Sequence, residues 1–290
     1  MPSSANSVRP PGRGEVVRLL EEHGLHPSKA LGQHFLVDPN TAERIARLAG
    51  VGKGDRVVEV GAGLGSLTVA LAATGAKVTA IEVDRGIVPV LRSVVGPLGV
   101  SVVEADAMRC DWEALLSDED RWTLVANLPY NVATPLVVDL LRDVPAIERM
   151  VVMVQREAGE RLVAVPGATG FGAVSVRVAY FATASIVGQV SAGVFLPRPK
   201  VASVLVELVR RSSPAVDPSD ASYEEIDLLL RAAYSARRKM LRRSLAGLVD
   251  EACLLACGIE PTSRAEELSV ENWGKLVACR RSITSSHQPS

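Results

Sequence analysis

Short valine-rich runs alternate with helix-like stretches along most of this chain, and this alternation restricts the fold more than any other sequence feature. Five runs are short, rich in β-branched residues and bounded by Gly, Asp or Pro, as buried strands are: Arg56–Val60, Lys77–Ile81, Val100–Val103, Leu124–Ala126 and Met150–Val154. Candidate helices lie between them at Gly65–Ala73, Ile87–Val94 and Pro135–Leu141. Strand–helix alternation predicts a doubly wound α/β domain with a parallel sheet.

The composition and the position of a linker extend this prediction to the whole chain. Apolar residues make up 48% but aromatic residues only 4%, so the core must consist of Val, Leu and Ala, as buried parallel sheets do. Two later runs, Ala184–Val190 and Ser203–Val209, are candidate antiparallel strands at a sheet edge. We therefore predict a disordered tail (1–14), an α/β catalytic domain (15–211) and, after a Ser/Pro/Asp linker, a small all-α domain (212–290).

A glycine-rich turn, Glu59–Gly65, closes the first predicted strand and opens a helix. Glycines at this place let a ligand approach the backbone at the carboxyl end of the sheet, and we expect Gly61 and Gly63 to contact it. A dinucleotide fingerprint needs G-x-G-x-x-G so that a pyrophosphate can meet the helix N-terminus. Ser66 stands where the third glycine belongs. The spacing favours a cofactor without phosphate, such as S-adenosylmethionine.

Two acidic residues follow the next strands. Glu82 ends the second strand, where a carboxylate can accept both hydroxyls of a ribose. Asp106 follows the third strand and can accept from an adenine amino group, with Met108 against the ring. Asp106 could instead be a helix N-cap or a solvated loop acid. Together the two acids indicate a nucleoside cofactor.

The sequence Asn127-Leu128-Pro129-Tyr130 follows the fourth strand and suits methyl transfer to an adenine amine. Such an amine is a poor nucleophile, because its lone pair is delocalised into the ring. An Asn oxygen and a backbone carbonyl can accept both N–H groups and direct the lone pair toward a sulfonium methyl group. Proline stiffens the turn, and tyrosine offers a stacking face to a flipped base. The alternative is a simple turn after a buried strand.

With these motifs in order, the chain resembles the KsgA/RsmA family of ribosomal RNA adenine dimethyltransferases over roughly residues 28 to 280. The matching segments are Gly32–Leu36, Glu59–Gly65, Glu82, Asp106, Asn127–Tyr130, Gln155–Glu157, Phe171–Ser175, Val194–Val201 and Arg237–Arg242. Two positions depart from the family. His34 stands where the family usually has Asn, so the likeness implies a backbone contact there, and Ala202 replaces a common Asp.

The resemblance implies a Rossmann-like methyltransferase that uses S-adenosylmethionine to place two methyl groups on each of two adjacent adenosines near the 3′ end of 16S rRNA. It implies that Tyr130 and Phe195 sandwich the flipped adenine, although without it Phe195 would be interpreted as edge-strand packing. The implied cofactor contacts are His34, Leu36, Gly61, Glu82, Asp106 and Asn127. Two alternatives stay open. One is a 23S rRNA adenine methyltransferase of the macrolide-resistance type, and the other is an assembly or transcription factor with this fold whose catalysis is dispensable.

A local basic cluster contrasts with a formal net charge of −1. We expect five of its residues to contact RNA phosphates from one helix: Arg237, Arg238, Lys239, Arg242 and Arg243. A solvated helix face is the alternative. The expected partner is 16S rRNA or the immature small ribosomal subunit, with no membrane.

The four cysteines form no C-x-x-C pair and have no His at ligand spacing. We therefore predict buried, reduced thiols in a cytoplasmic protein, with no metal. The protein is also expected to be a monomer.

Overall fold

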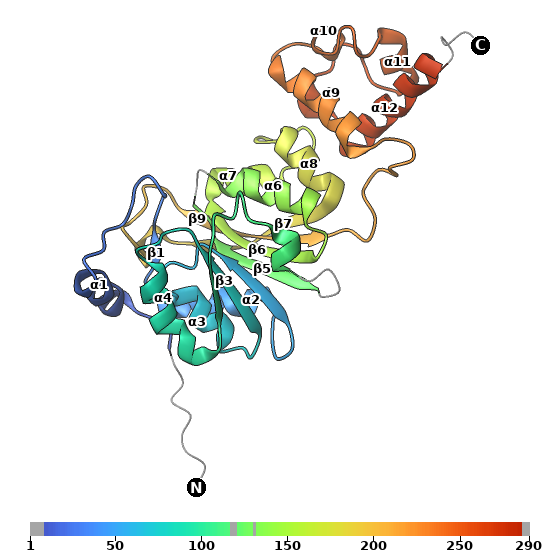
Figure 1. Ribbon diagram of the computed structural model, residues 1–290. Helices are drawn as coiled ribbons and strands as arrows, with labels where there is room; N and C mark the ends of the chain where they lie inside the picture. The colour runs from blue at the N-terminus through green and yellow to red at the C-terminus, as the bar shows by residue number, and fades with distance from the viewer. Residues whose placement is uncertain (1–8, 117–120, 130–131, 286–290) are drawn as a thin grey trace. The chain divides into compact units, whose positions relative to one another are not determined.

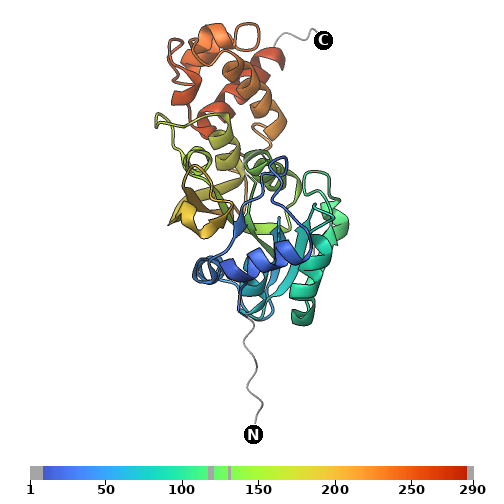
Figure 2. The same ribbon diagram turned by 90° about the vertical axis from the view of Figure 1, so that its left-hand side faces the viewer.

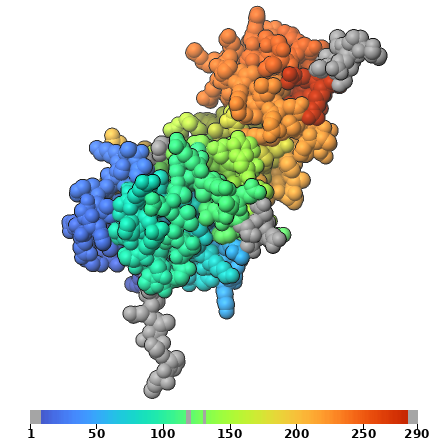
Figure 3. Space-filling view, viewed as in Figure 1, coloured from blue at the N-terminus to red at the C-terminus, as the bar shows by residue number. Residues whose placement is uncertain are grey.

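The computed structural model describes residues 9–116, 121–129 and 132–285, which are the coloured parts of Figure 3. The chain divides into two compact units. The sheet unit comprises residues 1–159 and 185–209, and the helical unit comprises residues 160–184 and 210–290. The division predicted at residues 211 and 212 stays a prediction about separately folding domains.

A seven-stranded sheet forms the sheet unit, with strand order β4-β3-β2-β5-β6-β9-β7. Strands β4, β3, β2, β5 and β6 run parallel, and β9 is antiparallel to β6. The doubly wound sheet and the antiparallel β9 are thus confirmed. The strands are β2 (Arg56–Val60), β3 (Lys77–Glu82), β4 (Ser101–Glu104), β5 (Trp122–Asn127), β6 (Ile147–Gln155), β7 (Ala182–Val190) and β9 (Ser203–Arg210). A separate two-stranded sheet pairs β1 (Phe35–Leu36) with β8 (Phe195–Leu196).

Helices cover both faces of the large sheet (Figure 1). On one face, Ile45 of α2 (Pro39–Ala49) and Leu71 of α3 (Ser66–Ala72) pack against strand valines. Helix α4 (Val88–Val95) packs beside α3. Helix α6 (Ala133–Asp143) lies on the opposite face, and the short α5 (Trp112–Leu115) lies in the β4–β5 connection. The core is aliphatic, as the composition predicts.

The predicted disordered tail is wrong for its last residues. Helix α1 (Arg13–Glu22) begins inside it and is the blue helix in front of the sheet unit in Figure 2. Pro10 and Pro11 are buried, and the Arg13 guanidinium donates to the Gly193 carbonyl at 2.9 Å. Side chains of α1 pack on Ile87 and neighbouring residues. Tertiary contacts therefore order this proline-rich segment, while residues 1–8 lie outside the described part.

The helical unit has its own apolar core, centred on Trp273 and Leu230. Residues 211–222 carry no helix or strand, as the linker prediction requires. Helix α7 (Arg156–Val163) crosses the boundary between the units. The other helices are α8 (Ala173–Phe181), α9 (Tyr223–Ser235), α10 (Leu241–Ser244), α11 (Glu251–Ala256) and α12 (Val270–Ser285). Because α8 contributes Val176 and Tyr180 to this core, the unit draws on two separate chain segments.

The expectation of one basic helix was wrong. Helix α9 ends at Ser235, and residues 236–240 form turns before the four-residue α10 begins. The backbone N–H groups of Leu241 and Arg242 bond to the carbonyls of Ser263 and Pro261. This pairing with a distant loop replaces the helical hydrogen bonds that the sequence pattern suggested. Among the described residues, no helix is both long and apolar enough to cross a bilayer.

Gly159 of α7 lies where a side chain does not fit. An added Cβ would stand 2.3 Å from Val204 Cγ2 and 3.1 Å from Val206 Cγ2, both on β9. We predict that Gly159→Ala lowers the free energy of unfolding by about 1–3 kcal/mol through overpacking, measured by urea denaturation. The control is Gly14→Ala in α1, where nothing lies within 4 Å and helix propensity favours alanine. Equal stability of the two variants would contradict this account of the packing.

Candidate active site

The glycine turn between β2 and α3 has the backbone conformation that its sequence predicts. Gly61, Gly63 and Gly65 have φ values of 72°, 56° and 86°, a region that side chains disfavour. A Cβ on Gly63 would lie 3.1 Å from the Phe35 ring, and one on Gly61 would lie 3.7 Å from the Asn127 carbonyl oxygen. The turn therefore brings three segments of chain close together at the carboxyl edge of the sheet.

Two adjoining pockets form a cleft at this edge. The more polar one is lined by the acids Glu59 and Glu82 and by Asn127. The other is mainly apolar and includes Asp106 and Met108. Both pockets are bounded by Leu31, Gly61, Val83 and Pro129. The cleft thus brings together all eight of the predicted cofactor residues, namely His34, Leu36, Gly61, Gly63, Glu82, Asp106, Met108 and Asn127.

Glu82 is held rigidly by the backbone. Its Oε2 accepts from Gly63 N–H at 2.8 Å, and its Oε1 accepts from Val83 and Asp84 N–H at 3.0 and 2.9 Å. Burial raises the pKa of the Glu82 carboxyl, although these three hydrogen bonds act in the opposite direction. A carboxylate has about four acceptor positions, so one remains for a ligand hydroxyl. This geometry suits a contact to one ribose hydroxyl, whereas the sequence predicted contacts to both.

Glu59 is a site residue that the sequence analysis did not assign. Its side chain is 1% exposed, and none of the described residues donates a hydrogen bond to its Oε2. Burial raises the pKa of Glu59 to about 8; the neighbouring Thr68 hydroxyl acts in the opposite direction, and the nearby charge of Glu82 adds to the shift. A buried acceptor without a partner costs free energy. The sequence could have indicated Glu59 as a site residue, because it is the acidic residue that begins the glycine turn.

Asp106 and Met108 lie at the apolar end of the cleft. Asp106 Oδ1 accepts from Met108 N–H at 2.9 Å, and its Oδ2 is 3.9 Å from the Arg109 guanidinium. Met108 is 39% exposed, so its side chain is available to pack against a planar ring. Asp106 both caps a turn and lines the cleft, so the two interpretations from sequence are compatible.

Asn127 is oriented by the segment that precedes β1. Its Nδ2 donates to the His34 backbone carbonyl at 3.0 Å. The amide nitrogen is therefore used within the protein, and the oxygen is the end that can accept from a substrate amine. The His34 ring adds a second link, since its Nδ1 donates to the Pro197 carbonyl at 2.7 Å. Histidine at this position thus acts through its backbone on Asn127 and through its ring on the loop after β8.

A second missed residue holds the same segment in place. Gln33 Nε2 donates to Asp84 Oδ2 at 2.7 Å, and its Oε1 accepts from Ser28 N–H at 2.7 Å. Gln33 therefore ties the Leu31–His34 wall of the cleft to the loop after β3. Gln33 lies in a segment that resembles the family. Its sequence alone does not indicate that its side chain bonds to Asp84 on that loop.

The predicted substrate residues are only partly brought together. Leu128 and Pro129 line the cleft beside Asn127, whereas Tyr130 lies outside the described residues. Phe195 is 1% exposed and packs in the sheet-unit core with Ile45 and Met153. Its ring has no free face for a base in this arrangement. The adenine sandwich stays a prediction, and it requires Phe195 to move.

The predicted RNA-contacting side chains lie in the helical unit, and all of them are exposed: Arg237, Arg238, Lys239, Arg242 and Arg243. Leu241 and Leu245 are fully buried beneath them and anchor the segment. Arg237 pairs with Glu266 at 3.4 Å, and Arg242 with Glu251 at 3.9 Å. No ion pair between described residues involves Arg238, Lys239 or Arg243. These three cations are the best placed to meet phosphates.

Three features define a Rossmann-like methyltransferase. They are the doubly wound sheet, a glycine turn without the spacing of a pyrophosphate-binding fingerprint, and the acids at the strand ends. A solved dimethyladenosine transferase from Plasmodium falciparum superposes with a TM-score of 0.71 at 26% identity, covering 84% of this chain and 96% of that one. A family model described as "Ribosomal RNA adenine dimethylase" matches residues 25–280. The chain belongs to this family and is a ribosomal RNA adenine dimethyltransferase, as the sequence resemblance predicts.

Two further comparisons bear on the choice of RNA. The "Ribosomal RNA small subunit methyltransferase A" of Thermobifida fusca is 41% identical over 277 residues, covering 92% of this chain and 94% of that protein. The solved 23S rRNA methyltransferase ErmE has a TM-score of 0.65 at 24% identity and covers 85% of this chain and 99% of that one. The likeness to ErmE extends to the fold alone, so the comparisons do not favour the large-subunit alternative.

The raised pKa of Glu59 generates a prediction about stability. Its folded-state value of about 8 lies above the ordinary value of 4.5. The folded protein therefore loses stability relative to the unfolded chain as pH rises from 4.5 through 8, by up to about 1.4 kcal/mol per pH unit. We predict that Glu59→Gln changes the melting temperature little at pH 5 and raises it by several degrees at pH 8.5.

The measurement is thermal unfolding of both proteins across this pH range, without added cofactor. Glu21→Gln, at an exposed site on α1, is the control. A melting temperature difference between Glu59→Gln and wild type that does not change with pH would contradict a neutral, buried Glu59.

Proposed function

We propose that the protein transfers methyl groups from S-adenosylmethionine to the N6 amines of two adjacent adenosines in a loop near the 3′ end of 16S rRNA, during small-subunit biogenesis. The observation that carries the proposal is the orientation of Asn127, whose amide nitrogen is bound to His34 so that its oxygen can accept from an amine. The similarity to the small subunit methyltransferase of Thermobifida fusca supports this choice of RNA.

The cleft fits S-adenosylmethionine in three respects. The rigid Glu82 carboxylate can accept from a ribose hydroxyl. Asp106 and Met108 can hold an adenine at the apolar end. Glu59 lines the same pocket, and its buried Oε2, which has no donor among the described residues, can accept a hydrogen bond from the amino group of the cofactor. When bound, the cofactor supplies the electrophilic methyl group.

The protein's own residues act on the adenosine by positioning. The Asn127 oxygen and the Leu128 carbonyl accept the two N–H groups of the N6 amine and turn its lone pair out of the ring plane. No general base of shifted pKa is needed, because the amine can lose its proton after transfer. Rate enhancement comes from alignment and from acceptors placed near the developing positive charge. A second methylation needs the same alignment with one N–H fewer.

We further propose that the protein acts as a monomer, in the cytoplasm, on 16S rRNA within the immature small subunit, and that it needs no metal. The free cations Arg238, Lys239 and Arg243 support contact with RNA phosphates from the helical unit. RNA bases are recognised mainly when they are unstacked, so a hairpin loop suits an enzyme that flips its target. An assembly role could coexist with methylation, and the next experiment separates the two.

We predict that Asn127→Ala reduces methyl transfer to immature small subunits at least 100-fold, because the amine is no longer aligned. RNA affinity should change less than twofold. The measurement uses tritiated methyl donor and maps the modified bases. Asn40→Ala, at an exposed position on α2, is the control. Full activity of Asn127→Ala would refute the mechanism. If the inactive variant restores growth to a strain that lacks the protein, a role in assembly alone is favoured.

We predict that replacing Arg238 and Arg243 together by Ala weakens RNA binding. The plot of the logarithm of the association constant against the logarithm of salt concentration should become less steep by about 1.4–1.8. Each side chain would otherwise release counterions from one phosphate. Binding is measured by filter retention at several salt concentrations. The control is Arg142→Ala, whose guanidinium is paired with Asp139 and Asp143. An unchanged slope would mean that the basic segment is only a solvated surface.

A further inference from the structure

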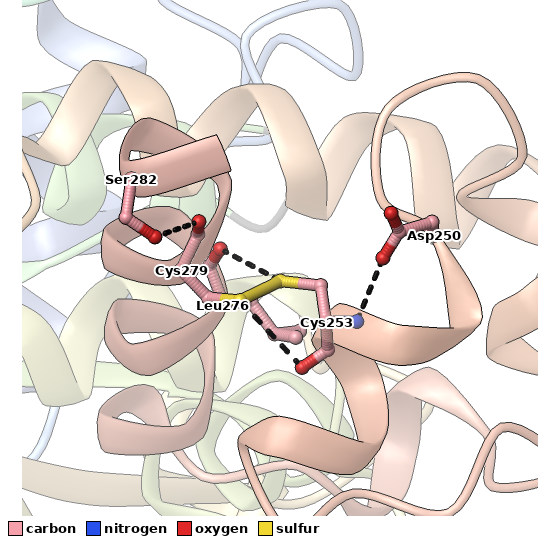
Figure 4. The surroundings of a disulfide bond; sticks show 5 residues. All are labelled: Asp250, Cys253, Leu276, Cys279 and Ser282. Atoms are coloured by element: carbon pink, nitrogen blue, oxygen red, sulfur yellow. Dashed lines mark hydrogen bonds between the residues drawn. A yellow bond between two sulfur atoms is a disulfide. The ribbon is translucent and has the colours of Figure 1, made fainter. Parts of the chain in front are cut away.

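Three of the four cysteines gather in the helical unit. Cys253 lies on α11, Cys257 caps the end of that helix, and Cys279 lies on α12. Their Sγ atoms all lie within 4.8 Å of one another. The sequence prediction of reduced thiols was wrong for two of them, because Cys253 and Cys279 form a disulfide (Figure 4). Cys257 stays a free thiol beside it.

The backbone holds the pair at a normal spacing for a disulfide. The two Cα atoms are 6.0 Å apart, within the usual range. The Asp250 carboxylate accepts from Cys253 N–H at 2.7 Å and fixes the start of α11, as Figure 4 shows. Helix packing, and not sequence spacing, brings the sulfurs together, since 26 residues separate them.

The three sulfurs differ in accessibility. Cys253 is 2% exposed and belongs to the core around Trp273. Cys257 and Cys279 are half-buried and lie at its border. Cys279 is therefore the more accessible residue of the bonded pair. Burial raises the pKa of the Cys257 thiol, and the positive charge of Lys275 acts in the opposite direction. Cys257 is thus mainly protonated at neutral pH and leaves the neighbouring bond intact.

We propose that Cys253, Cys257 and Cys279 form a thiol–disulfide exchange site whose reactants are low-molecular-weight thiols and disulfides. The site is independent of methyl transfer. This inference rests on the proposed cytoplasmic location, because disulfides in reducing compartments are mostly transient and serve catalysis or redox sensing. A third protein sulfur within 4.8 Å of the bond allows exchange within the protein, which a purely structural bond does not need.

The exchange proceeds in two balanced steps. A small thiolate attacks Cys279 Sγ, forming a mixed disulfide and releasing Cys253 as a thiolate that takes up a proton. Cys257, after losing its proton, then attacks Cys279 Sγ and expels the small thiol, or a second small thiol attacks the small-molecule sulfur and frees Cys279. In the second route two small thiols are oxidised to one small disulfide, and the Cys253–Cys279 bond is reduced to two thiols.

The test counts free thiols in the full-length protein. The protein is equilibrated with excess oxidised or excess reduced glutathione, quenched in acid, unfolded, labelled with a maleimide and weighed by mass spectrometry. We expect two labels and no glutathione adduct in the oxidised arm, and four labels in the reduced arm. Peptide mapping should locate the bond at Cys253 and Cys279. The reduced form should melt roughly 5–10 °C lower, because the cross-link between α11 and α12 is lost.

Two variants define the role of the third sulfur. Cys257→Ser should show one and three labels in the two arms, and during reduction it should accumulate a glutathione adduct that wild type resolves faster. Cys110→Ser, outside the cluster, is the matched control and should show one and three labels without accumulation of the adduct.

Four labels in both arms would overturn the proposal. A parallel arm adds Cd²⁺ to the reduced protein. If Cd²⁺ protects three cysteines from labelling while the oxidised arm still shows four labels, the cluster is a thiolate metal site and exchange is refuted. These readouts do not involve methylation, so they stand or fall separately from the proposed function.

Discussion

The parallel register of β3, β2 and β5 is the constraint on which the active site depends. Val60 pairs with Ile81 and with Ala126, so the residues that follow each strand emerge at one edge. The glycine turn, Glu82 and Asn127 are far apart in sequence and meet there for this reason alone. The hydrogen bond from Asn127 to the His34 carbonyl then closes the edge with a segment from outside the sheet. Strand pairing thus places the groups, and one side-chain bond orients the one that aligns the substrate.

Two buried acids give the cleft its electrostatic character. Glu82 is surrounded by three backbone donors, whereas Glu59 has an oxygen that no described residue satisfies. An unpartnered buried acceptor is destabilising in the folded protein, and it persists where a ligand can relieve the cost. Glu82 is therefore already positioned by the protein, whereas Glu59 has an acceptor atom that a bound ligand can satisfy.

The helical unit shows how a buried anchor can support a polar surface. Leu241 and Leu245 are fully buried, and the backbone at Leu241 and Arg242 bonds to the loop at 261–263. These contacts hold a turn-rich basic segment in place where the sequence pattern predicted a longer helix. In the same unit, the packing of α11 on α12 brings Cys253 and Cys279 together, which links its stability to the oxidation state of two sulfurs.

The sequence by itself determined the parallel sheet and the glycine turn. It also placed Glu82, Asp106 and the Asn127–Pro129 loop at the ends of strands. Each of these features depends on local periodicity or on spacing within one strand–turn unit. Even β2 was predicted at its observed bounds, Arg56–Val60. Only the tertiary structure decided the burial of Glu59 and Phe195, the order at Pro10 and Pro11, the break before α10 and the cysteine pairing. Each of these depends on contacts between residues distant in the chain, and a local pattern carries no information about which distant group will supply the contact.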